Sequence, residues 1–201
     1  MRRESITFFA AVITILCVTV FVSTATGALW YAPDTEVPVP AETEELRERT
    51  ALPEDYPARL RIPTLGVDAY VQEVGVNAKG NMAAPNNFTD VGWYKHGTVP
   101  GFVGSAVVAG HVDNGLSLPG VFKNLNSIHI GDDIFLEKKD GGELRFRVTE
   151  IQTYPYAHVP LKVLFSRRDI PRLNLVTCEG DWIPSNKMYD QRLIVYTELV
   201  E

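Results

Sequence analysis

Cysteine is scarce in this chain of 201 residues, which contains only Cys17 and Cys178. Two cysteines cannot build the disulfide framework of a small secreted domain, so neither is expected to act as a structural staple. The zinc spacings CxxC and HExxH, a glycine-rich phosphate loop and internal repeats are all absent. The four histidines are scattered at positions 96, 111, 129 and 158, so we expect no metal and no cofactor.

Basic residues are also fewer than acidic ones. The chain has 19 Lys and Arg against 25 Asp and Glu, for a net charge of −6 and an isoelectric point near 5.3. Phosphate binding needs a basic face, so nucleic acid is not an expected partner. The 45% of hydrophobic and 22% of charged residues exclude a disordered chain, a collagen-like repeat and a polytopic membrane protein. They suit one ordinary domain with an additional segment.

That additional segment lies near the N-terminus, where residues 6–31 carry no charge. Of these 26 residues 19 are hydrophobic, and Arg2 and Arg3 precede them. A helix of this length reaches about 39 Å, enough to cross a hydrocarbon core of roughly 30 Å. The arginines favour a cytoplasmic N-terminus. We therefore expect a cytoplasmic segment at 1–5, a transmembrane signal anchor at 6–31 and an extracellular remainder, giving a single-pass protein of the cell membrane.

A cleaved signal peptide is the alternative for the same segment. Ala25 and Gly27 supply the small residues that precede a possible cut before Ala28. The apolar stretch is longer than a usual signal-peptide core, which favours the uncleaved anchor. Cys17 is expected to be an inert apolar residue of the span, since Leu16 stands where a lipid-attachment site needs a small residue.

Residues 32–57 have a different composition, rich in proline and in acidic side chains. Prolines stand at 33, 38, 40, 53 and 57, and eight acidic residues are interspersed. Such a segment buries little and stays extended, although Glu42 to Arg49 could form a short helix. We expect it to be a linker that holds the following domain off the membrane surface.

The domain expected at residues 58–201 has the pattern of a β protein. Its short Val-, Ile-, Tyr-, Phe- and Thr-rich runs are separated by Gly, Pro and Asn turns. The predicted strands are Leu60–Ile62, Ala69–Val74, Ser105–Ala109, Asp133–Glu137, Leu144–Thr153, Leu173–Thr177 and Arg192–Leu199. Only Val121–Leu125 and Leu161–Phe165 suggest helical turns. Seven or eight strands with so little helix indicate a closed β-barrel or a sandwich.

Reactive side chains follow two of these apolar strands. The first strand leads through Gly110 to His111, and the second leads through Thr177 to Cys178, while Arg192 opens a third. A strand end holds a residue rigidly while its tip faces a cleft. Cys178, His111 and Arg192 together supply a nucleophile, a proton carrier and a cation that cannot lose its proton. This set suits acyl transfer, although a lone cysteine is more often a small buried hydrophobe.

An ordered series of motifs resembles the sortases, the membrane-anchored cysteine transpeptidases of Gram-positive bacteria. The series is Gly92-Trp93-Tyr94, Pro100-Gly101, Gly104 to His111, Phe122 to Leu125, Gly131-Asp132, Thr177-Cys178 and Arg192. It covers about Arg59 to Leu199. The Gly-Trp-Tyr segment, the His-Val-Asp-Asn sequence and the short C-terminus are most similar to the class F sortases of actinobacteria.

The resemblance implies an eight-stranded sortase β-barrel with short helices and an active site at one end. By position, it implies that Cys178 is the nucleophile, His111 the acid and base, and Arg192 the group that binds substrate and steadies the oxyanion. Thr177 would support the substrate pocket. The reaction implied is that of the cysteine peptidase class of hydrolases, with no metal.

The same resemblance implies the partners. These are secreted proteins with a C-terminal sorting signal similar to Leu-Pro-x-Thr-Gly, and an amine of a cell-wall precursor or of another protein. The signal is cleaved after Thr through a thioester, and water could replace the amine. We expect a monomer.

A second hypothesis comes from a different class of protein. The chain could be a membrane-tethered β-barrel that binds peptides without chemistry, with Cys178 as a buried structural thiol. His96, Asp113 and Trp182 could border the cleft in either case, but surface or packing roles explain them equally well.

Overall fold

The computed structural model describes residues 37–39, 51–114, 116 and 118–200. The predicted cytoplasmic segment at 1–5, the predicted anchor at 6–31 and Cys17, which was expected to be inert, lie outside these residues. Within the described ranges, no helix combines the length and the apolar character needed to cross a membrane.

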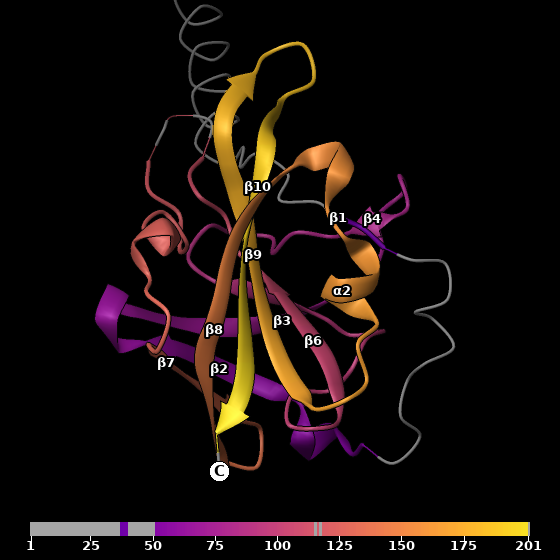
Figure 1. The fold of residues 1–201 in the computed structure, drawn as a ribbon, viewed down its shortest axis with the longest axis vertical. Coiled ribbons are helices and arrows are strands. Elements are labelled where there is room, and N and C mark those ends of the chain that lie inside the picture. The colour runs from indigo at the N-terminus through magenta and orange to yellow at the C-terminus, as the bar shows by residue number, and fades with distance from the viewer. Residues whose placement is uncertain (1–36, 40–50, 115, 117, 201) are drawn as a thin grey trace, which may run out of the picture.

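Eight strands of the described chain form a closed barrel, which confirms the predicted mainly-β barrel with short helices (Figure 1). Around the barrel the order is β10-β8-β7-β2-β3-β5-β6-β9. The strands are β2 (Pro57–Ile62), β3 (Val67–Val74), β5 (Val91–Tyr94), β6 (Gly104–Ala109), β7 (Asp133–Lys138), β8 (Glu143–Pro155), β9 (Pro171–Ile183) and β10 (Met188–Val200). The pairs β3–β5 and β6–β9 are parallel, and the others are antiparallel.

Each of the seven predicted strands lies within one strand of the barrel, but β5 was not predicted. Its four residues, Val91–Tyr94, are all buried, so they show no alternation of polar and apolar side chains. Strand β5 pairs with β3 on one side and β6 on the other. Without it the barrel would have an open edge between these two strands.

Alternate residues of the strands point into the barrel and form the inner core. On β9 these are Leu173 and Leu175, which pack with Leu193 and Val195 of β10. Trp93 is fully buried there, and its ring centroid lies 5.1 Å from that of Tyr56. Burial of such side chains is the main source of free energy that stabilises the barrel.

The intervening residues of β6, β9 and β10 form a second, outer core with the one α-helix of the described chain, α2 (Leu161–Phe165). Leu164 and Phe165 of α2 pack in this cluster with Val176 of β9, and Figure 1 shows the helix beside β6. The buried amide Nδ2 of Asn174 donates a 2.7 Å hydrogen bond to the carbonyl oxygen of Leu164. The side chain of Asn174 therefore fastens the helix to the outer face of β9.

Part of the expected linker at 32–57 packs on the domain, which corrects the prediction of a solvated spacer along its whole length. Strand β1 (Val37–Pro38) pairs with β4 (Asn81–Met82), and Val37 is fully buried in the outer core. Tyr56 is also buried, and β2 begins at Pro57. The proline-rich composition concealed these apolar contacts, because proline is tolerated at the edge of a sheet.

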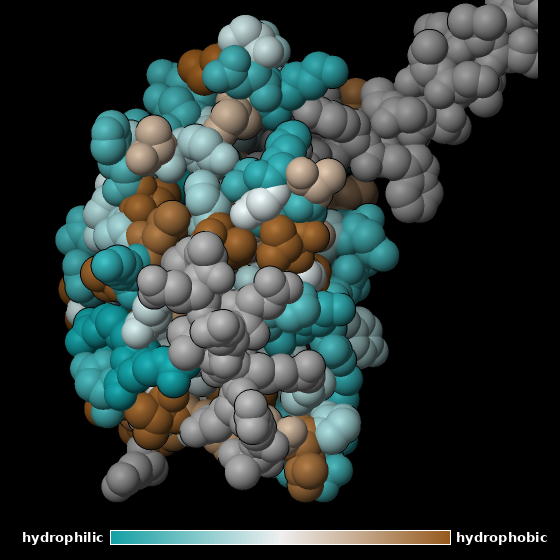
Figure 2. All heavy atoms as spheres, turned by 90° about the vertical axis from the view of Figure 1, so that its right-hand side faces the viewer, coloured by the Kyte–Doolittle hydropathy of each residue, from teal (hydrophilic) through white to brown (hydrophobic). Residues whose placement is uncertain are grey.

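The remaining elements are short 3₁₀ helices. They are η2 (Pro53–Asp55), η3 (Pro63–Leu65), η4 (Leu125–Ser127) and η5 (Tyr156–His158). The predicted helical turn at Leu161–Phe165 coincides with α2, whereas the one at Val121–Leu125 is a turn that leads into η4. The face that carries α2, β1 and β4 is mainly hydrophilic, with hydrophobic groups in separate places (Figure 2).

Candidate active site

Cys178 of β9 lies directly opposite Arg192 of β10 in the antiparallel register. Residues that are directly opposite in two neighbouring strands project their side chains from the same face of the sheet. The two side chains therefore leave the backbone at neighbouring positions by virtue of the strand pairing alone. Cys178 and Arg192, which are not adjacent in the sequence, are thus held on neighbouring strands.

His111 reaches Cys178 from the other side of β9. Strands β6 and β9 run parallel with Ala109 paired to Val176, and the Gly110 amide donates to the Val176 carbonyl oxygen at 3.1 Å. His111 follows two residues after Ala109, where β6 ends, and Cys178 follows two residues after Val176 within β9. The fold therefore gathers the three predicted reactive residues on one face, with Cys178 between the other two.

This face is the outer one, which ends at the outer core. Val176 precedes Cys178 on this face of β9, and Ile194 follows Arg192 on the same face of β10. Both residues belong to the outer core. Cys178, Arg192 and His111 have exposed fractions of 0%, 1% and 2%. Charges removed from water to this extent interact far more strongly than at a solvated surface.

Thr177 projects from the opposite face of β9, because side chains alternate along a strand. Its hydroxyl is buried and donates a 2.8 Å hydrogen bond to the carbonyl oxygen of Gly110. The bond ties the residue before the nucleophile to the residue before His111. Thr177 is thus placed to fix the separation of the two strand ends, and its predicted contribution to the substrate pocket stays a prediction.

The chain segment that follows His111 is braced by residues 120–122. The amide of Phe122 donates to the His111 carbonyl oxygen at 2.9 Å, and that of Gly120 donates to the Val112 carbonyl oxygen at 2.9 Å. A Cβ atom on Gly120 would lie 2.3 Å from the His111 carbonyl oxygen. Only glycine allows the two backbones to approach this closely.

The imidazole of His111 is oriented by backbone as well. Its Nε2 lies 3.0 Å from the carbonyl oxygen of Pro85. A carbonyl oxygen can only accept a hydrogen bond, so this contact favours a ring with the proton on Nε2. The other nitrogen, Nδ1, then carries the lone pair in the neutral ring.

Arg192 is held in one orientation by two backbone carbonyls and one aromatic ring. Its Nη1 donates to the carbonyl oxygens of Tyr189 at 3.0 Å and of Gln191 at 2.8 Å. Its guanidinium carbon lies 4.7 Å from the ring centroid of Tyr156, a residue of η5. Tyr156 was not predicted as a site residue, because only the tertiary fold brings η5 to β10.

A β-bulge follows Cys178 and bends the β9–β10 hairpin. Trp182 pairs with Tyr189 and Glu179 with Gln191, so Gly180 and Asp181 together face the single residue Asp190. Gly180 has a φ of 83°, a left-handed conformation that suits glycine at a bulge. The hairpin extends beyond the barrel in Figure 1, next to the site.

Tyr189 and Asp113 form a buried pair beside these residues. The Tyr189 hydroxyl donates a 2.7 Å hydrogen bond to Oδ2 of Asp113, a side chain that is 5% exposed. Burial, this hydrogen bond and the charges of Asp113 and Cys178 raise the pKa of Tyr189. Asp113 was a weak candidate from the sequence, and Tyr189 was not one, since no motif marks it.

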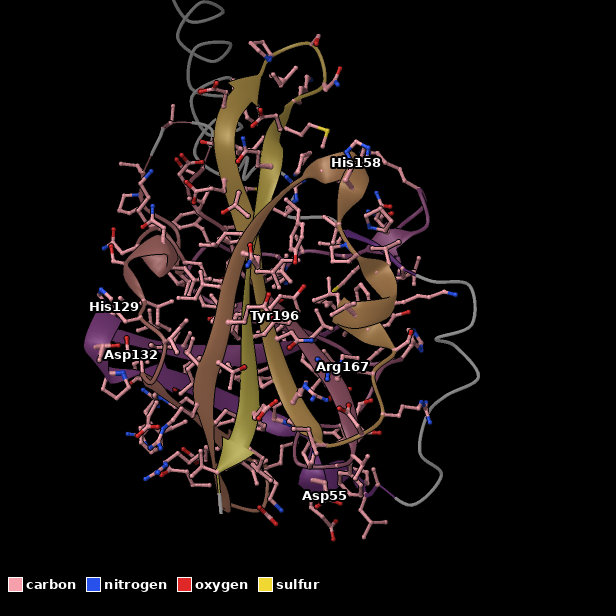
Figure 3. The ribbon with its side chains drawn as sticks, in the orientation of Figure 1. Asp55, His129, Asp132, His158, Arg167 and Tyr196 are labelled. Atoms are coloured by element: carbon pink, nitrogen blue, oxygen red, sulfur yellow. The ribbon has the colours of Figure 1, made fainter. Side chains whose placement is uncertain are left out.

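The other histidines lie in separate parts of the fold. His129 lies beside Asp132, whose Oδ2 accepts a hydrogen bond from the His129 amide at 2.9 Å, whereas His158, in η5, lies on the other side of the molecule (Figure 3). The ring centroid of His96 lies 5.7 Å from that of Tyr94. Among the described residues, no group of three or more His, Cys, Asp and Glu side chains could hold a metal ion. The side chains that the site supplies itself are a thiol, an imidazole and a guanidinium.

The family model of the sortase domain matches residues 60–200, which span the whole barrel after the first part of β2. None of the curated proteins matches.

Several solved structures share the fold. Sortase C1 from Streptococcus agalactiae, solved in complex with MTSET, is 21% identical with a TM-score of 0.53, and the match covers 71% of this chain and 66% of that one. Sortase C-1 from Actinomyces oris is 23% identical with a TM-score of 0.55, over 72% of this chain and 73% of that one. The sortase D5 transpeptidase of Clostridium perfringens is 21% identical with a TM-score of 0.54, over 73% and 79%.

These matches agree with the barrel. The chain spans about two thirds of the length of the Streptococcus agalactiae protein. Identities of this size establish the fold, while the family model, which covers well over half of the chain, establishes the family. The relatives named are sortases C1, C-1 and D5, so the resemblance to class F stays a prediction. The chain belongs to the sortase family.

Proposed function

We propose that the chain is a sortase-type cysteine transpeptidase that cleaves a sorting signal similar to Leu-Pro-x-Thr-Gly and transfers the acyl group to an amine. The observation that carries the proposal is the register of the barrel strands, in which Cys178 lies opposite Arg192 and beside the end of the strand that bears His111. A nucleophile, a proton carrier and a fixed cation on one face are the groups that acyl transfer requires.

The first half of the reaction forms a thioester. The Sγ of Cys178, as thiolate, attacks the carbonyl carbon of the Thr residue in the signal. The guanidinium of Arg192 donates hydrogen bonds to the oxyanion that develops on the carbonyl oxygen. The imidazolium of His111 gives a proton to the departing amine of Gly, the C–N bond breaks, and the acyl group stays on Cys178.

The second half returns the enzyme to its starting state. Nδ1 of the neutral His111 takes a proton from the incoming amine, whose nitrogen attacks the thioester carbon. The C–S bond breaks, the new amide leaves, and Cys178 and His111 again hold one thiolate and one imidazolium. Water in place of the amine gives hydrolysis by the same steps. The Nε2 contact with Pro85 supports the assignment of Nδ1 to proton transfer.

The setting proposed for this reaction is the outer surface of the cell membrane. The uncharged segment at residues 6–31 would anchor the chain, and the barrel would act on secreted proteins and on cell-wall or protein amines outside. The class most similar by sequence motif is class F. Retention of the full chain in membranes after a high-salt wash tests the anchor, and release into the medium would contradict it.

A quenched fluorescent peptide with a Leu-Pro-x-Thr-Gly motif tests the reaction. We expect cleavage by the full chain, and an added mass on Cys178 equal to the acyl fragment in intact-protein mass spectrometry. Cys178→Ala should abolish both signals. Cleavage that survives this substitution would eliminate the thioester. A folded wild-type chain that binds sorting peptides without cleavage or adduct would instead identify a peptide-binding module.

A further inference from the structure

A small pocket adjoins the site on the side of Arg192. It has a volume of about 150 Å³, far more than the roughly 10–15 Å³ that one water molecule requires. Its lining includes three cations, Lys79, Lys187 and Arg192, and three neutral hydrogen-bonding side chains, Asn81, Tyr156 and Asn186. No acidic residue of the described chain lines it, although acids outnumber bases in the sequence by 25 to 19.

Lys79 is presented to this pocket by a tight turn. Oδ1 of Asn77 accepts hydrogen bonds from the amides of Lys79, at 2.9 Å, and of Asn81, at 3.1 Å. Gly80 between them has a φ of 80°. Nδ2 of Asn81 donates to the Tyr156 hydroxyl at 3.4 Å, which connects the turn to the ring that lies under Arg192. The turn, η5 and Arg192 therefore form one connected wall.

Lys187 supplies the opposite wall from the tip of the β9–β10 hairpin, in a strained conformation. Its φ of 52° is the only positive value among the non-glycine residues of the described chain. Glycine or asparagine adopts this conformation at less cost. Sparsely populated backbone conformations of this kind cluster at functional sites. Here Lys187 lines the pocket.

We propose that this pocket binds a carboxylate of the substrate. The carboxylate is either an acidic side chain of the sorting peptide or a carboxylate of the amine acceptor. The inference rests on the proposed function for its setting, because Arg192, opposite Cys178, is shared by the pocket and by the reaction. Two ammonium groups and several neutral donors favour an anion over a neutral amide of the same shape.

Because the chain has a net charge of −6, recognition of a carboxylate depends on the local group of cations in this pocket. The chain as a whole repels anions, so an acidic substrate gains binding free energy only where cationic side chains lie close together. Ammonium groups near a surface distinguish a carboxylate from an amide by about fivefold in affinity. Screening by salt should reduce this preference at high ionic strength.

The test compares acids with their amides in two arms. In the donor arm, peptides carry Glu or Gln at the variable position of Leu-Pro-x-Thr-Gly, or at the position before Leu, and hydrolysis is followed without an acceptor. In the acceptor arm, diglycine competes with diglycinamide for the acyl group, and products are quantified by mass spectrometry. We expect a preference of about fivefold for the acid in one arm at low salt. The arm that shows it identifies the source of the carboxylate.

The variants are Lys79→Gln, Lys187→Asn and their combination. Asparagine suits the left-handed conformation of Lys187, so Lys187→Asn should fold at least as stably as the wild type. Lys162→Gln removes an exposed lysine of α2 outside the pocket and serves as the control. We expect the double variant to lose the preference for the acid while it turns over the neutral peptide at the wild-type rate, and the control to keep the preference.

Two results would overturn the proposal: a wild type without preference in either arm, or a double variant that keeps the preference. Failure of the proposed function would look different, since no peptide would then be cleaved. In that case, fluorescence anisotropy measures the affinity of the Cys178→Ala chain for the Glu and Gln peptides, and this comparison still tests the pocket. Tighter binding of the Glu peptide that depends on Lys79 and Lys187 supports the pocket, and equal binding refutes it.

Discussion

The hydroxyl of Tyr189, on β10, donates a 2.7 Å hydrogen bond to Oδ2 of the buried Asp113, which stands two residues after His111. The bond joins the hairpin that carries Arg192 to the segment that carries His111. The Oδ1 atom of Asp113 has no hydrogen-bond partner within the described chain, and Nζ of Lys123 lies 3.7 Å from Oδ2. The phenol is therefore a principal stabilising partner of this carboxylate.

We expect Tyr189→Phe to lower the free energy of unfolding by about 1–3 kcal/mol, because it leaves a buried carboxylate without its donor. Chemical denaturation of Tyr189→Phe, Asp113→Asn and the double variant measures the coupling. The two effects should be clearly non-additive, since the residues share one bond. Additive effects would show that the pair contributes no interaction energy.

Thr177→Val removes the 2.8 Å hydrogen bond to the Gly110 carbonyl oxygen while nearly keeping the side-chain volume. Thr197→Val is the control, because the buried Thr197 hydroxyl of β10 also donates to a backbone carbonyl oxygen, that of Leu173 in β9, at 2.6 Å and away from Cys178. Each variant should lose about 1–3 kcal/mol of stability. Only Thr177→Val should also lower kcat/KM, by about tenfold or more, because His111 is displaced. Equal activity in the two variants would leave Thr177 with a packing role alone.

Arg192→Lys keeps the positive charge but loses the planar fork that donates to two backbone carbonyls. Under the proposed mechanism, we expect acyl-enzyme formation to slow by about a hundredfold to a thousandfold, as for the loss of one oxyanion donor. Single-turnover kinetics with the sorting peptide measure this step. Near-normal kinetics would contradict the oxyanion role of the guanidinium.

Acid should weaken the fold through Asp169. Hydrogen bonds from Arg172, with a further one from Arg167, hold the pKa of this carboxyl below its ordinary value. A carboxyl with a depressed folded-state pKa stabilises the protein above its unfolded pKa of about 3.9, and that stability is lost as the pH falls through the lower folded value.

We therefore expect Asp169→Asn to lower Tm at pH 7 and the difference from the wild type to shrink below about pH 4. Thermal unfolding across this range measures the effect, with Asp181→Asn, at an exposed acid, as the control. A difference in Tm that does not depend on pH would mean that the charge of Asp169 has no part in its contact with Arg172.

The sequence predicted most of the barrel for a local reason. Alternating apolar residues mark β2, β3, β7 and β8, and apolar runs mark β6, β9 and β10, since each strand must bury at least one face. Strand β5 was missed because it has only four residues and one of them is Gly92, a residue type that is depleted in strands. Burial of Val37 in the predicted linker was missed because it depends on Met82, a residue brought near only by pairing of β1 with β4.

The sequence by itself determined that Cys178, His111 and Arg192 stand at the ends of rigid apolar strands, in an order that indicated the sortase family. Only the tertiary structure decided that these residues share one outer face, that Thr177 ties two of their strands together, and that Tyr189 meets Asp113. The physical reason is that strand propensity is local, whereas register, the bulge at Gly180 and the closure of the barrel depend on pairings between distant segments.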